Sequence, residues 1–445
     1  MNLAGFLDQL GDVPWSQAPA DLKRKSKDYF WFSPVLSALL HDCEADVIVS
    51  PRSVDEVMTV AAASARTGVP LTPRGGGTGN YGQAVPLRRG AVIDMTGLAR
   101  LIEVADGVVT VEAGMTLHAL EQALRARGHE LRMFPSTWET ATVGGFVSGG
   151  TGGVGSVTWG GLREPGNLIG TSLVTVEDTP RLIDLTGSQC NLINRTFGTT
   201  GLLVRLALPV QPAVDWHDLL VTFEQFEDAI AFGHAMCKAQ GVQKRLCSIS
   251  DDRQARYFRP YVPYIPEGSA IAALMVAPAG LVAAHELAAA HNGRVTLERA
   301  SGGEEGPSLP IYELGFNHAT QHVLRRERGH TYLQTIFPTP EILHGLRTRL
   351  GDEVMWHVEF IGFDGGHVMN SLPVIRYTGE ERLAELIAIF ENAGAPVANP
   401  HVYTVEDGSR YKRLPGDQLG FKHDVDPQGL LNPGKMRTFM PSETL

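Results

Sequence analysis

Cysteine is scarce in this sequence, and the few cysteines are scattered. Among 445 residues there are four, at Cys43, Cys190, Cys237 and Cys247, with no C-x-x-C spacing. Zinc and iron–sulfur sites built from four cysteines are therefore excluded. The pattern is typical of a protein held in a reducing compartment.

Excess positive charge and long apolar runs are also absent. The formal net charge of −11 argues against nucleic acid or an anionic membrane surface as a partner. Pro278 and Gly280 interrupt the longest uncharged apolar stretch outside the glycine-rich regions (268–284), so no membrane span is expected. Asp8 and the lack of a basic start argue against a signal peptide in residues 1–12. The predicted location is the cytoplasm.

Glycine, by contrast, is abundant, and its densest stretch organises the chain. Residues 73–82 read P-R-G-G-G-T-G-N-Y-G and follow an apolar run at 69–71. A glycine backbone can adopt positive φ and lie close against a ligand, and several N–H groups around one concavity bind an anion such as a phosphate. A flexible surface turn is the plainer interpretation of the same residues.

The stretch contains the pattern G-x-G-x-x-G in a setting that argues against an NAD-binding Rossmann unit. Gly77, Gly79 and Gly82 have the spacing, but Pro86 follows, and then a strand-like run at 91–95. The Rossmann pattern must open a helix, and here no helix has room to begin. Loop amides, rather than a helix N-terminus, are expected to hold the phosphate.

The apolar periodicity predicts an α+β chain of short elements. The first 45 residues are expected to be helical and packed on the main body, although their basic-aromatic cluster at 23–32 would also suit a partner. Strands are predicted at 47–49, 91–95, 107–112, 172–176 and 181–184, and helices at 54–67 and 117–127. After Pro209 and Pro212 a second α+β unit is expected to reach about residue 393, with strands at 221–223 and 271–277 and helices at 224–240 and 281–291.

A second glycine-dense stretch lies at 142–161. Apolar residues, among them Val143, Phe146 and Val154, are interleaved with its glycines. Burial against another surface is therefore expected rather than a disordered linker. Together, the two glycine-rich stretches could enclose an extended ligand from two sides.

The order of the motifs resembles that of the FAD-linked oxidoreductases of the vanillyl-alcohol oxidase / p-cresol methylhydroxylase (PCMH) fold. The glycine loop is followed by I-D-M-T-G-L-A-R-L-I, V-T-V-E-A-G-M-T-L-H-A-L, V-G-G-F-V-S-G-G, F-G-T-T-G-L-L-V and D-P-Q-G-L-L-N-P-G-K-M. The likeness covers about residues 46–212 and 399–436, with a weak match between them.

This resemblance implies a two-part PCMH-type FAD-binding domain with an inserted α+β cap domain. The implied division is a helical segment at 1–45, the FAD-binding domain at 46–212, the cap or substrate domain at 213–395, and a segment at 396–445 that returns to the FAD domain. The implied cofactor-binding residues are Arg74, Gly75, Gly76, Gly77, Thr78, Gly79, Asn80, Thr142, Gly144, Gly145, Ser148, Gly149, Gly152, Gly153, Gly201, Leu202, Leu203 and Asn432.

The sequence departs from the family in two places. Many relatives attach FAD covalently through a histidine in the first loop, but no histidine occurs between Arg74 and Pro86, and Thr78 stands in that region. FAD is therefore predicted to be bound non-covalently. Members similar to glycolate and D-lactate dehydrogenases carry a G-D-G-N-x-H metal motif, which residues 363–367 (F-D-G-G-H) match only in part. No metal is predicted, although His318 and His322 have a metal-capable spacing, with His357 or His367 as further ligand candidates.

Polar side chains in the last third of the chain are the candidates for chemistry on a substrate. If residues 399–403 form a strand, His401 and Tyr403 share one face, as His357 and Glu359 do in a strand at 356–360. His401 is the predicted base, with Tyr403 and His357 as polar contacts, and a structural role for each histidine is the alternative. Arg376 is a candidate clamp for a substrate carboxylate, or an exposed strand residue.

These features predict an FAD-dependent oxidoreductase that acts on a small hydroxylated substrate, such as a D-2-hydroxy acid, with an electron acceptor that the sequence leaves open. Hydride transfer to the flavin N5 atom is the expected chemistry. The alternative is a flavin-binding subunit of a larger electron-transfer complex without its own substrate chemistry. A homo-oligomer is compatible with either.

Overall fold

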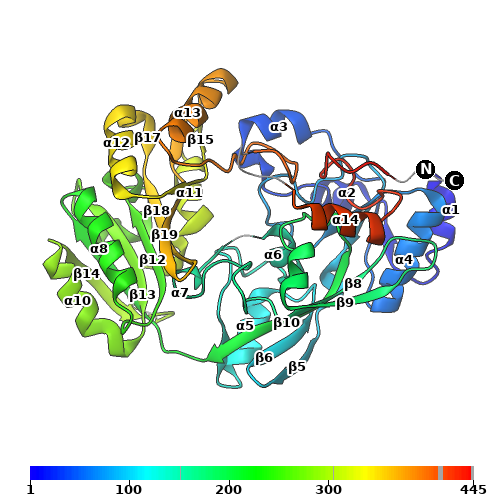
Figure 1. Cartoon of the computed structure of the whole chain (residues 1–445), viewed down its shortest axis with the longest axis horizontal. Coiled ribbons are helices and arrows are strands. Elements are labelled where there is room, and N and C mark those ends of the chain that lie inside the picture. Colours follow the sequence, from blue (N-terminus) through cyan, green and yellow to red (C-terminus); the bar gives the residue numbers. More distant parts are fainter. Residues whose placement is uncertain (151, 304, 409–413, 442–445) are drawn as a thin grey trace.

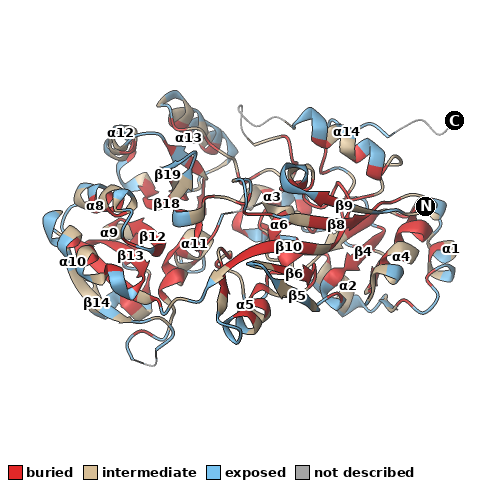
Figure 2. Ribbon diagram, turned by 60° about the horizontal axis from the view of Figure 1, so that its bottom comes forward, coloured by how far each residue is buried: buried red, intermediate tan, exposed pale blue. Residues whose placement is uncertain are grey.

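The computed structural model describes residues 1–150, 152–303, 305–408 and 414–441, which form two lobes (Figure 1). Buried residues line the strands at the centre of each lobe (Figure 2). The predicted α+β class is confirmed. We retain the predicted domain boundaries as a proposal and describe the sheets themselves.

One lobe contains both glycine-rich stretches, and we call it the nucleotide-side lobe. Its first sheet is mainly parallel and has the order β1-β2-β4-β3. Its strands are β1 (Trp15–Ser16), β2 (Val47–Val49), β3 (Leu71–Arg74) and β4 (Ala91–Asp94). The accompanying helices are α1 (Leu3–Asp8), α2 (Pro19–Lys25), α3 (Pro34–Leu40) and α4 (Val54–Thr67). The bounds of α4 are those predicted, because Ser53 caps its N-terminus through the Glu56 amide and Gly68 ends it in a left-handed conformation at φ 67°.

The second sheet of this lobe is antiparallel, with the order β5-β6-β10-β8-β9 and with β7 paired to β10. Its strands are β5 (Leu101–Ala105), β6 (Val108–Glu112), β7 (His129–Leu131), β8 (Gly170–Val174), β9 (Leu182–Thr186) and β10 (Leu202–Pro212). The helices α5 (Leu117–Arg125), α6 (Val143–Gly149) and α14 (Gly416–Val425) complete the lobe, and α7 (Ser156–Trp159) packs against the sheet of the other lobe.

The other lobe, which we call the cap, is built on a seven-stranded sheet. Its order is β14 (Arg294–Ala300), β11 (His217–Phe223), β13 (Ala270–Val276), β12 (Lys244–Ser250), β18 (His357–Phe363), β19 (Gly366–Ser371) and β16 (Thr335–Phe337). A three-stranded sheet has the order β15 (His330–Tyr332), β20 (Val374–Arg376) and β17 (Val354–Met355). The cap helices are α8 (Phe226–Lys238), α9 (Asp252–Ala255), α10 (Leu281–Ala290), α11 (Phe316–Leu324), α12 (Pro340–Leu350) and α13 (Glu380–Asn392).

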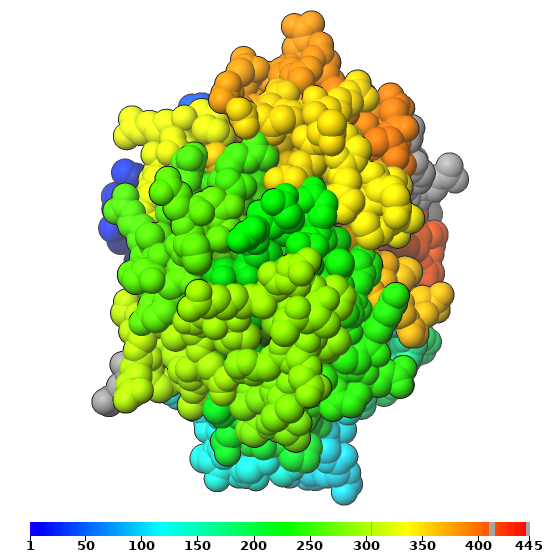
Figure 3. All heavy atoms as spheres, turned by 90° about the vertical axis from the view of Figure 1, so that its left-hand side faces the viewer, coloured from blue at the N-terminus to red at the C-terminus, as the bar shows by residue number. Residues whose placement is uncertain are grey.

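The helices of the cap cover the two faces of its main sheet unequally. Helices α8 and α10 lie on the outer face, whereas α11 lies toward the other lobe (Figure 1). Viewed from the outside, residues of the cap cover most of the face (Figure 3). The apolar core on the inner side includes residues of both lobes, and Trp138 donates from Nε1 to the Tyr312 hydroxyl across the boundary at 2.9 Å.

Buried charges also join the two lobes. Arg245 on β12 is 4% exposed and lies 3.4 Å from Glu121 and 3.5 Å from Glu130, both in the nucleotide-side lobe. The Trp216 Nε1–H donates to Glu130 at 3.1 Å. These buried contacts therefore join the two lobes, although Arg245 Nε has no hydrogen-bond partner among the described residues.

The last described segment returns to the first sheet. The Leu71 amide donates to the Leu430 carbonyl at 2.8 Å, and the Asn432 amide donates to the Leu71 carbonyl at 2.7 Å. Residues 430–432 therefore extend the β3 edge, next to the glycine loop. Among the described residues, no helix has the length and apolar character needed to cross a bilayer.

Candidate functional site: a glycine-lined slot that opens into a chamber

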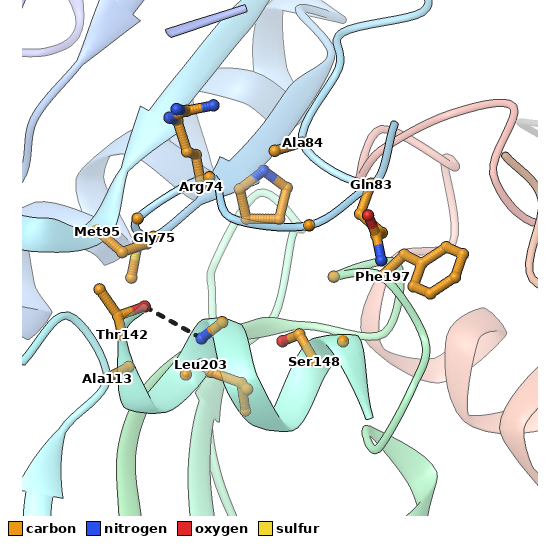
Figure 4. Close-up of a pocket in the computed structure, with 18 of the residues that line it drawn as sticks. Arg74, Gly75, Gln83, Ala84, Met95, Ala113, Thr142, Ser148, Phe197 and Leu203 are labelled. Carbon is orange, nitrogen blue, oxygen red and sulfur yellow. Dashed lines mark hydrogen bonds between the residues drawn. The ribbon is translucent and has the colours of Figure 1, made fainter. Parts of the chain in front are cut away.

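The glycine loop forms one wall of a narrow slot, and helix α6 forms the other (Figure 4). The loop connects the parallel strands β3 and β4, as predicted, and no helix begins in it. The slot is lined by Asp28, Pro73, Arg74, Gly75, Gly76, Gly77, Thr78, Gly79, Gln83, Ala84, Met95, Ala113, Thr142, Gly144, Gly145, Ser148, Gly149, Phe197, Gly198, Gly201 and Leu203.

The loop amides at the slot are free to bind an anion. The N–H groups of Gly76, Gly77, Thr78 and Gly79 donate no hydrogen bond to any residue that the structure describes. Gly77 has φ 67°, which turns successive amides toward one concavity. Unpaired amide donors at a concave wall suit the oxygens of a pyrophosphate.

The slot is narrow because the two glycine-rich stretches approach each other closely. A Cβ atom at Gly76 would lie 2.0 Å from the Thr140 carbonyl oxygen, and one at Gly75 would lie 2.0 Å from Thr142 Oγ1. A Cβ atom at Gly149 would meet no protein atom within 4 Å, although this residue lines the slot. It would therefore occupy the open space itself. The residues present fit an extended dinucleotide such as FAD.

The slot opens into a larger chamber of about 780 Å³ between the lobes. The slot and the chamber share the lining residues Thr78, Gly79, Gln83, Gly145 and Gly149. The chamber is further lined by Asn80, Tyr81, Pro135, Ser136, Thr137, Ala141, Phe146, Gly150, Gly152 and Arg195 from one lobe, and by Phe316, Asn317, Gln334, Thr335, Ile336, Pro338, Ile361, Asn370, Leu372, Gly394, Pro396, Val397 and Ala398 from the other side. Its volume is in the range of small-molecule sites, about 300–1,000 Å³.

Charged residues beneath the loop hold it in place. The carboxylate of Asp28 accepts from the amides of Phe30 at 3.0 Å and Ala84 at 3.3 Å, and the Lys435 ammonium donates to the Gly82 carbonyl. Burial raises the pKa of Asp28 and lowers the pKa of Lys435, and each charge opposes the shift of the other. The N-terminal segment and the returning C-terminal segment therefore clamp the same loop.

A chain of polar side chains borders the chamber. Asn80 Nδ2 donates to the Tyr332 hydroxyl at 2.5 Å, and the Tyr81 side chain lies close to those of Tyr332 and Gln334. Tyrosine is protonated at neutral pH, so the Tyr81 hydroxyl can donate to a ligand, and burial raises its pKa further, to about 12.

Most of the predicted cofactor residues line the slot or the chamber, and a few do not. Asn80 and Gly152 lie in the chamber. Leu202 is buried in the core, Gly153 packs on the Phe134 carbonyl, and Asn432 lies outside both cavities. Asn432 Nδ2 donates to the carbonyls of Gln83 at 2.8 Å and Phe197 at 2.7 Å, and thus braces the slot from behind. Arg74 lines the slot, but its head group turns away from α6 and bonds the Lys25 and Lys27 carbonyls (Figure 4).

The structure places His401 away from both cavities. Residues 399–403 are not a strand, so the predicted sharing of one face with Tyr403 is wrong. The ring is 3% exposed, its Nε2–H donates to the Tyr332 carbonyl at 3.0 Å, and its Nδ1 accepts from the Ser33 hydroxyl at 2.7 Å. Both nitrogens are used within the protein, which leaves none for a substrate proton.

Nor do the other predicted catalytic side chains line the slot or the chamber. Tyr403 faces a separate cavity of about 660 Å³ on the other side of the glycine loop, where its ring lies 5.3 Å from Lys435 Nζ. Arg376 is exposed on β20, opposite His330. The positions of these side chains are set by tertiary packing, and the alternation of residues along a strand does not predict that packing.

His357 and Glu359 do share one face, as predicted, but that face is buried. His357 Nε2–H donates to Glu359 Oε1 at 2.6 Å, and His357 Nδ1 accepts from the Ser250 hydroxyl at 3.0 Å. Glu359 Oε1 also accepts from the Ser248 hydroxyl at 3.0 Å and from the Phe316 amide at 2.5 Å. The pair thus caps the N-terminus of α11, whose Phe316 and Asn317 line the chamber.

The histidines with metal-capable spacing are engaged elsewhere. His318 lies 2.6 Å from Glu313, His322 packs edge-on against Phe258, and His367 contacts His234 at 2.8 Å. No group of three or more potential ligands gathers among the described residues.

We predict that His401 makes folding stability depend on pH. Burial lowers its pKa from 6.5 to about 4, so the folded state needs the neutral ring. The stabilisation is complete above pH 6.5 and is lost as the pH falls toward 4, by up to about 3 kcal/mol. In urea unfolding, wild type should exceed His401→Gln in stability at pH 7, and this gap should narrow by pH 4.5. A gap that stays constant would contradict the prediction, and His41→Gln, at an exposed position, is the control.

Comparison with known proteins identifies the nucleotide-side lobe. Residues 45–179 match the model of the FAD binding domain family. The chain is 31% identical to D-lactate dehydrogenase of Archaeoglobus fulgidus over 51% of each chain. It is 33% identical to D-2-hydroxyglutarate dehydrogenase of Escherichia coli over 35% of this chain and 16% of that protein. It is 24% identical to glycolate oxidase subunit GlcD of Bacillus subtilis over 42% of this chain and 41% of that protein.

The fold extends the likeness over the whole chain. A solved structure of alkyldihydroxyacetonephosphate synthase superposes with a TM-score of 0.73 over 98% of this chain and 85% of that one, at 15% identity. A variant of BBE-like 1 from Physcomitrella patens gives 0.64 over 97% and 98%, at 13% identity.

These matches confirm the predicted resemblance. Residues 45–179 match an FAD-binding domain, and the chain is similar to FAD-linked dehydrogenases and oxidases. The aligned segments span about half or less of the length of the curated relatives described above.

Proposed function

We propose that the chain is an FAD-dependent oxidoreductase that oxidises a small D-2-hydroxy acid. The observation that carries the proposal is the slot with four free loop amides, which continues into a chamber walled by both lobes. The relatives named D-lactate and D-2-hydroxyglutarate dehydrogenase support this substrate class.

In this proposal, each group of lining residues has a separate role. The amides of Gly76, Gly77, Thr78 and Gly79 would hold the pyrophosphate, and Ser148 and Gly149 would contact the neighbouring part of the cofactor. A bound FAD would supply the acceptor for the hydride that leaves the carbon bearing the substrate hydroxyl. The apolar walls of the chamber exclude water, and Tyr81 and Gln334 supply neutral polar contacts. No cysteine or histidine reaches a flavin from the described lining, in agreement with non-covalent binding.

A second function rests on a separate observation. The chamber lining in the described part of the chain holds no histidine, aspartate or glutamate to take the hydroxyl proton. One relative is a glycolate oxidase subunit, so a flavin-binding subunit without its own substrate chemistry is the competing proposal.

Anaerobic reduction of the bound flavin tests the proposal. The FAD-loaded protein is mixed with a panel of D- and L-2-hydroxy acids, and the visible absorbance is followed. We expect at least one D-2-hydroxy acid to bleach the flavin band within seconds to minutes. If no member of the panel bleaches the band while dithionite does, the proposal fails and the subunit function is favoured.

A further inference from the structure

The chamber has a single positive charge in its described lining. Arg195 is the one ionisable cation there, and no carboxylate or histidine accompanies it among the described residues. Tyr81, beside it, is a phenol and therefore neutral at physiological pH, and burial raises its pKa further, to about 12. The electrostatic potential of the chamber is therefore positive at one wall and close to neutral elsewhere.

The backbone at Arg195 is held rigidly. Its φ is 61°, its amide donates to the Val147 carbonyl at 3.2 Å, and it abuts Gly150, where a Cβ atom would lie 2.2 Å from the Arg195 Cβ. A left-handed conformation is unfavourable for arginine, so the surrounding structure must maintain it. Such strain is characteristic of functional positions.

The guanidinium of Arg195 has no partner in the described protein. It makes no hydrogen bond or ion pair with any described residue, whereas Arg245 and Arg299 each bond a buried carboxylate. A second arginine, Arg163, is near enough for its positive charge to act on that of Arg195, and it bonds the Asn194 carbonyl at 3.0 Å. Because five N–H donors are left unused at a cavity wall, an anionic group of a ligand can take them in a bidentate arrangement.

The remainder of the chamber wall is largely apolar. Phe146, Phe316, Ile336, Ile361, Leu372 and Val397 supply side chains without charge. A ligand bound at Arg195 would therefore place its far end against apolar surface or neutral amides such as Asn317 and Asn370. A second carboxylate at that end would lose its hydration without gaining a cation from the described lining.

We infer that Arg195 anchors the carboxylate of the substrate and selects 2-hydroxy monocarboxylates with an apolar tail over dicarboxylates. The identification of the bound anion as a substrate rests on the proposed function, whereas the anion site itself does not depend on any reaction. The inference distinguishes between the substrates in the names of the two relatives, since lactate carries one carboxylate and 2-hydroxyglutarate carries two.

The test measures anion binding and turnover separately. Calorimetry with the FAD-loaded protein and hexanoate, which has no hydroxyl to oxidise, reports binding without chemistry. We expect Arg195→Gln to weaken hexanoate binding by about 10- to 100-fold, which is the loss of charge-assisted hydrogen bonds, and Arg195→Lys to restore part of it. Arg325→Gln, at an exposed position on the C-cap of α11, is the matched control and should bind like wild type.

Turnover then reports selectivity. With D-2-hydroxyhexanoate as substrate, Arg195→Gln should raise KM by a similar factor, and wild type should prefer this substrate to D-2-hydroxyglutarate by about 100-fold or more in kcat/KM. Equal hexanoate affinity in wild type and Arg195→Gln, or a preference for the dicarboxylate, would overturn the inference. A loss of FAD affinity in Arg195→Gln would also overturn it, because the residue would then serve the cofactor.

The outcomes separate this inference from the proposed function. Hexanoate binding that depends on Arg195, without bleaching by any hydroxy acid, would keep the anion site and reject the oxidase or dehydrogenase activity. Bleaching by a hydroxy acid with the same KM in wild type and Arg195→Gln would keep the activity and reject the anchor.

Discussion

Replacing Gly76 by alanine is expected to weaken FAD binding by at least about 100-fold. The added Cβ would lie 2.0 Å from the Thr140 carbonyl oxygen, which is backbone and cannot rotate away. The loop would have to move, and its amides with it, so the donors for the pyrophosphate would be lost together with some stability. The measurement is the dissociation constant of FAD, with urea unfolding of the apoprotein alongside.

Two further alanine variants distinguish a specific loss of FAD binding from a general loss of stability. Gly149→Ala has no protein atom within 4 Å of the new Cβ, so it should fold like wild type and still weaken FAD binding, because the methyl group enters the slot. Gly345→Ala, inside α12 and also without contacts, should leave FAD binding unchanged and be neutral or slightly stabilising. Wild-type FAD affinity in both Gly76→Ala and Gly149→Ala would contradict the assignment of the slot.

Replacing Glu359 by alanine is expected to destabilise the protein by about 3–5 kcal/mol. The carboxylate is 1% exposed, and its removal leaves the His357 Nε2–H, the Ser248 hydroxyl and the Phe316 amide without their acceptor. Removing one partner from such a buried group of hydrogen-bonded side chains typically lowers the free energy of unfolding by about 3–5 kcal/mol. Urea unfolding measures the change.

The same substitution should also alter the chamber. Glu359 caps α11, and the first residues of α11, Phe316 and Asn317, line the chamber wall, so ligand affinity should fall while FAD affinity stays near the wild-type value. Glu385→Gln on the exposed face of α13 is the control and should change stability by less than about 0.5 kcal/mol. An unchanged unfolding free energy in Glu359→Ala would show that the buried network does not support α11.

The sequence predicted elements that depend on local signals. Helix α4 begins and ends at the predicted residues because Ser53 and Gly68 are strong capping signals. The loop after β3 was predicted from residues that exclude a helix, and it is the wall of the slot. The short helices α6 and α7 at 142–161 were not predicted, because glycine has a low helix propensity. Helix α6 is stabilised by the Thr142 cap and by packing in the core that includes β10, and α7 is stabilised by packing of Val157 in the core of the cap.

The catalytic candidates depended on tertiary arrangement, and the sequence could not supply it. A histidine in such a stretch looks alike in the sequence whether it faces a cavity or, like His401, bonds Ser33, which lies 368 residues earlier in the chain, and the carbonyl of Tyr332. Arg195 was overlooked although it precedes the F-G-T-T-G-L-L-V motif by two residues, because no local pattern marks an unpaired guanidinium. A charged residue next to a recognised cofactor motif is the signal that could have found it.

The most direct test of this account is the binding of FAD, FMN and riboflavin to the apoprotein by calorimetry. The slot is assigned to the pyrophosphate and the parts of FAD next to it, and of the pyrophosphate FMN keeps one phosphate and riboflavin none. We therefore expect one FAD per chain, binding at least about 100-fold weaker for the other two, and full release of FAD on denaturation. Equal affinities for FAD and FMN would show that the slot does not hold the dinucleotide. No binding of any flavin would contradict the assignment altogether.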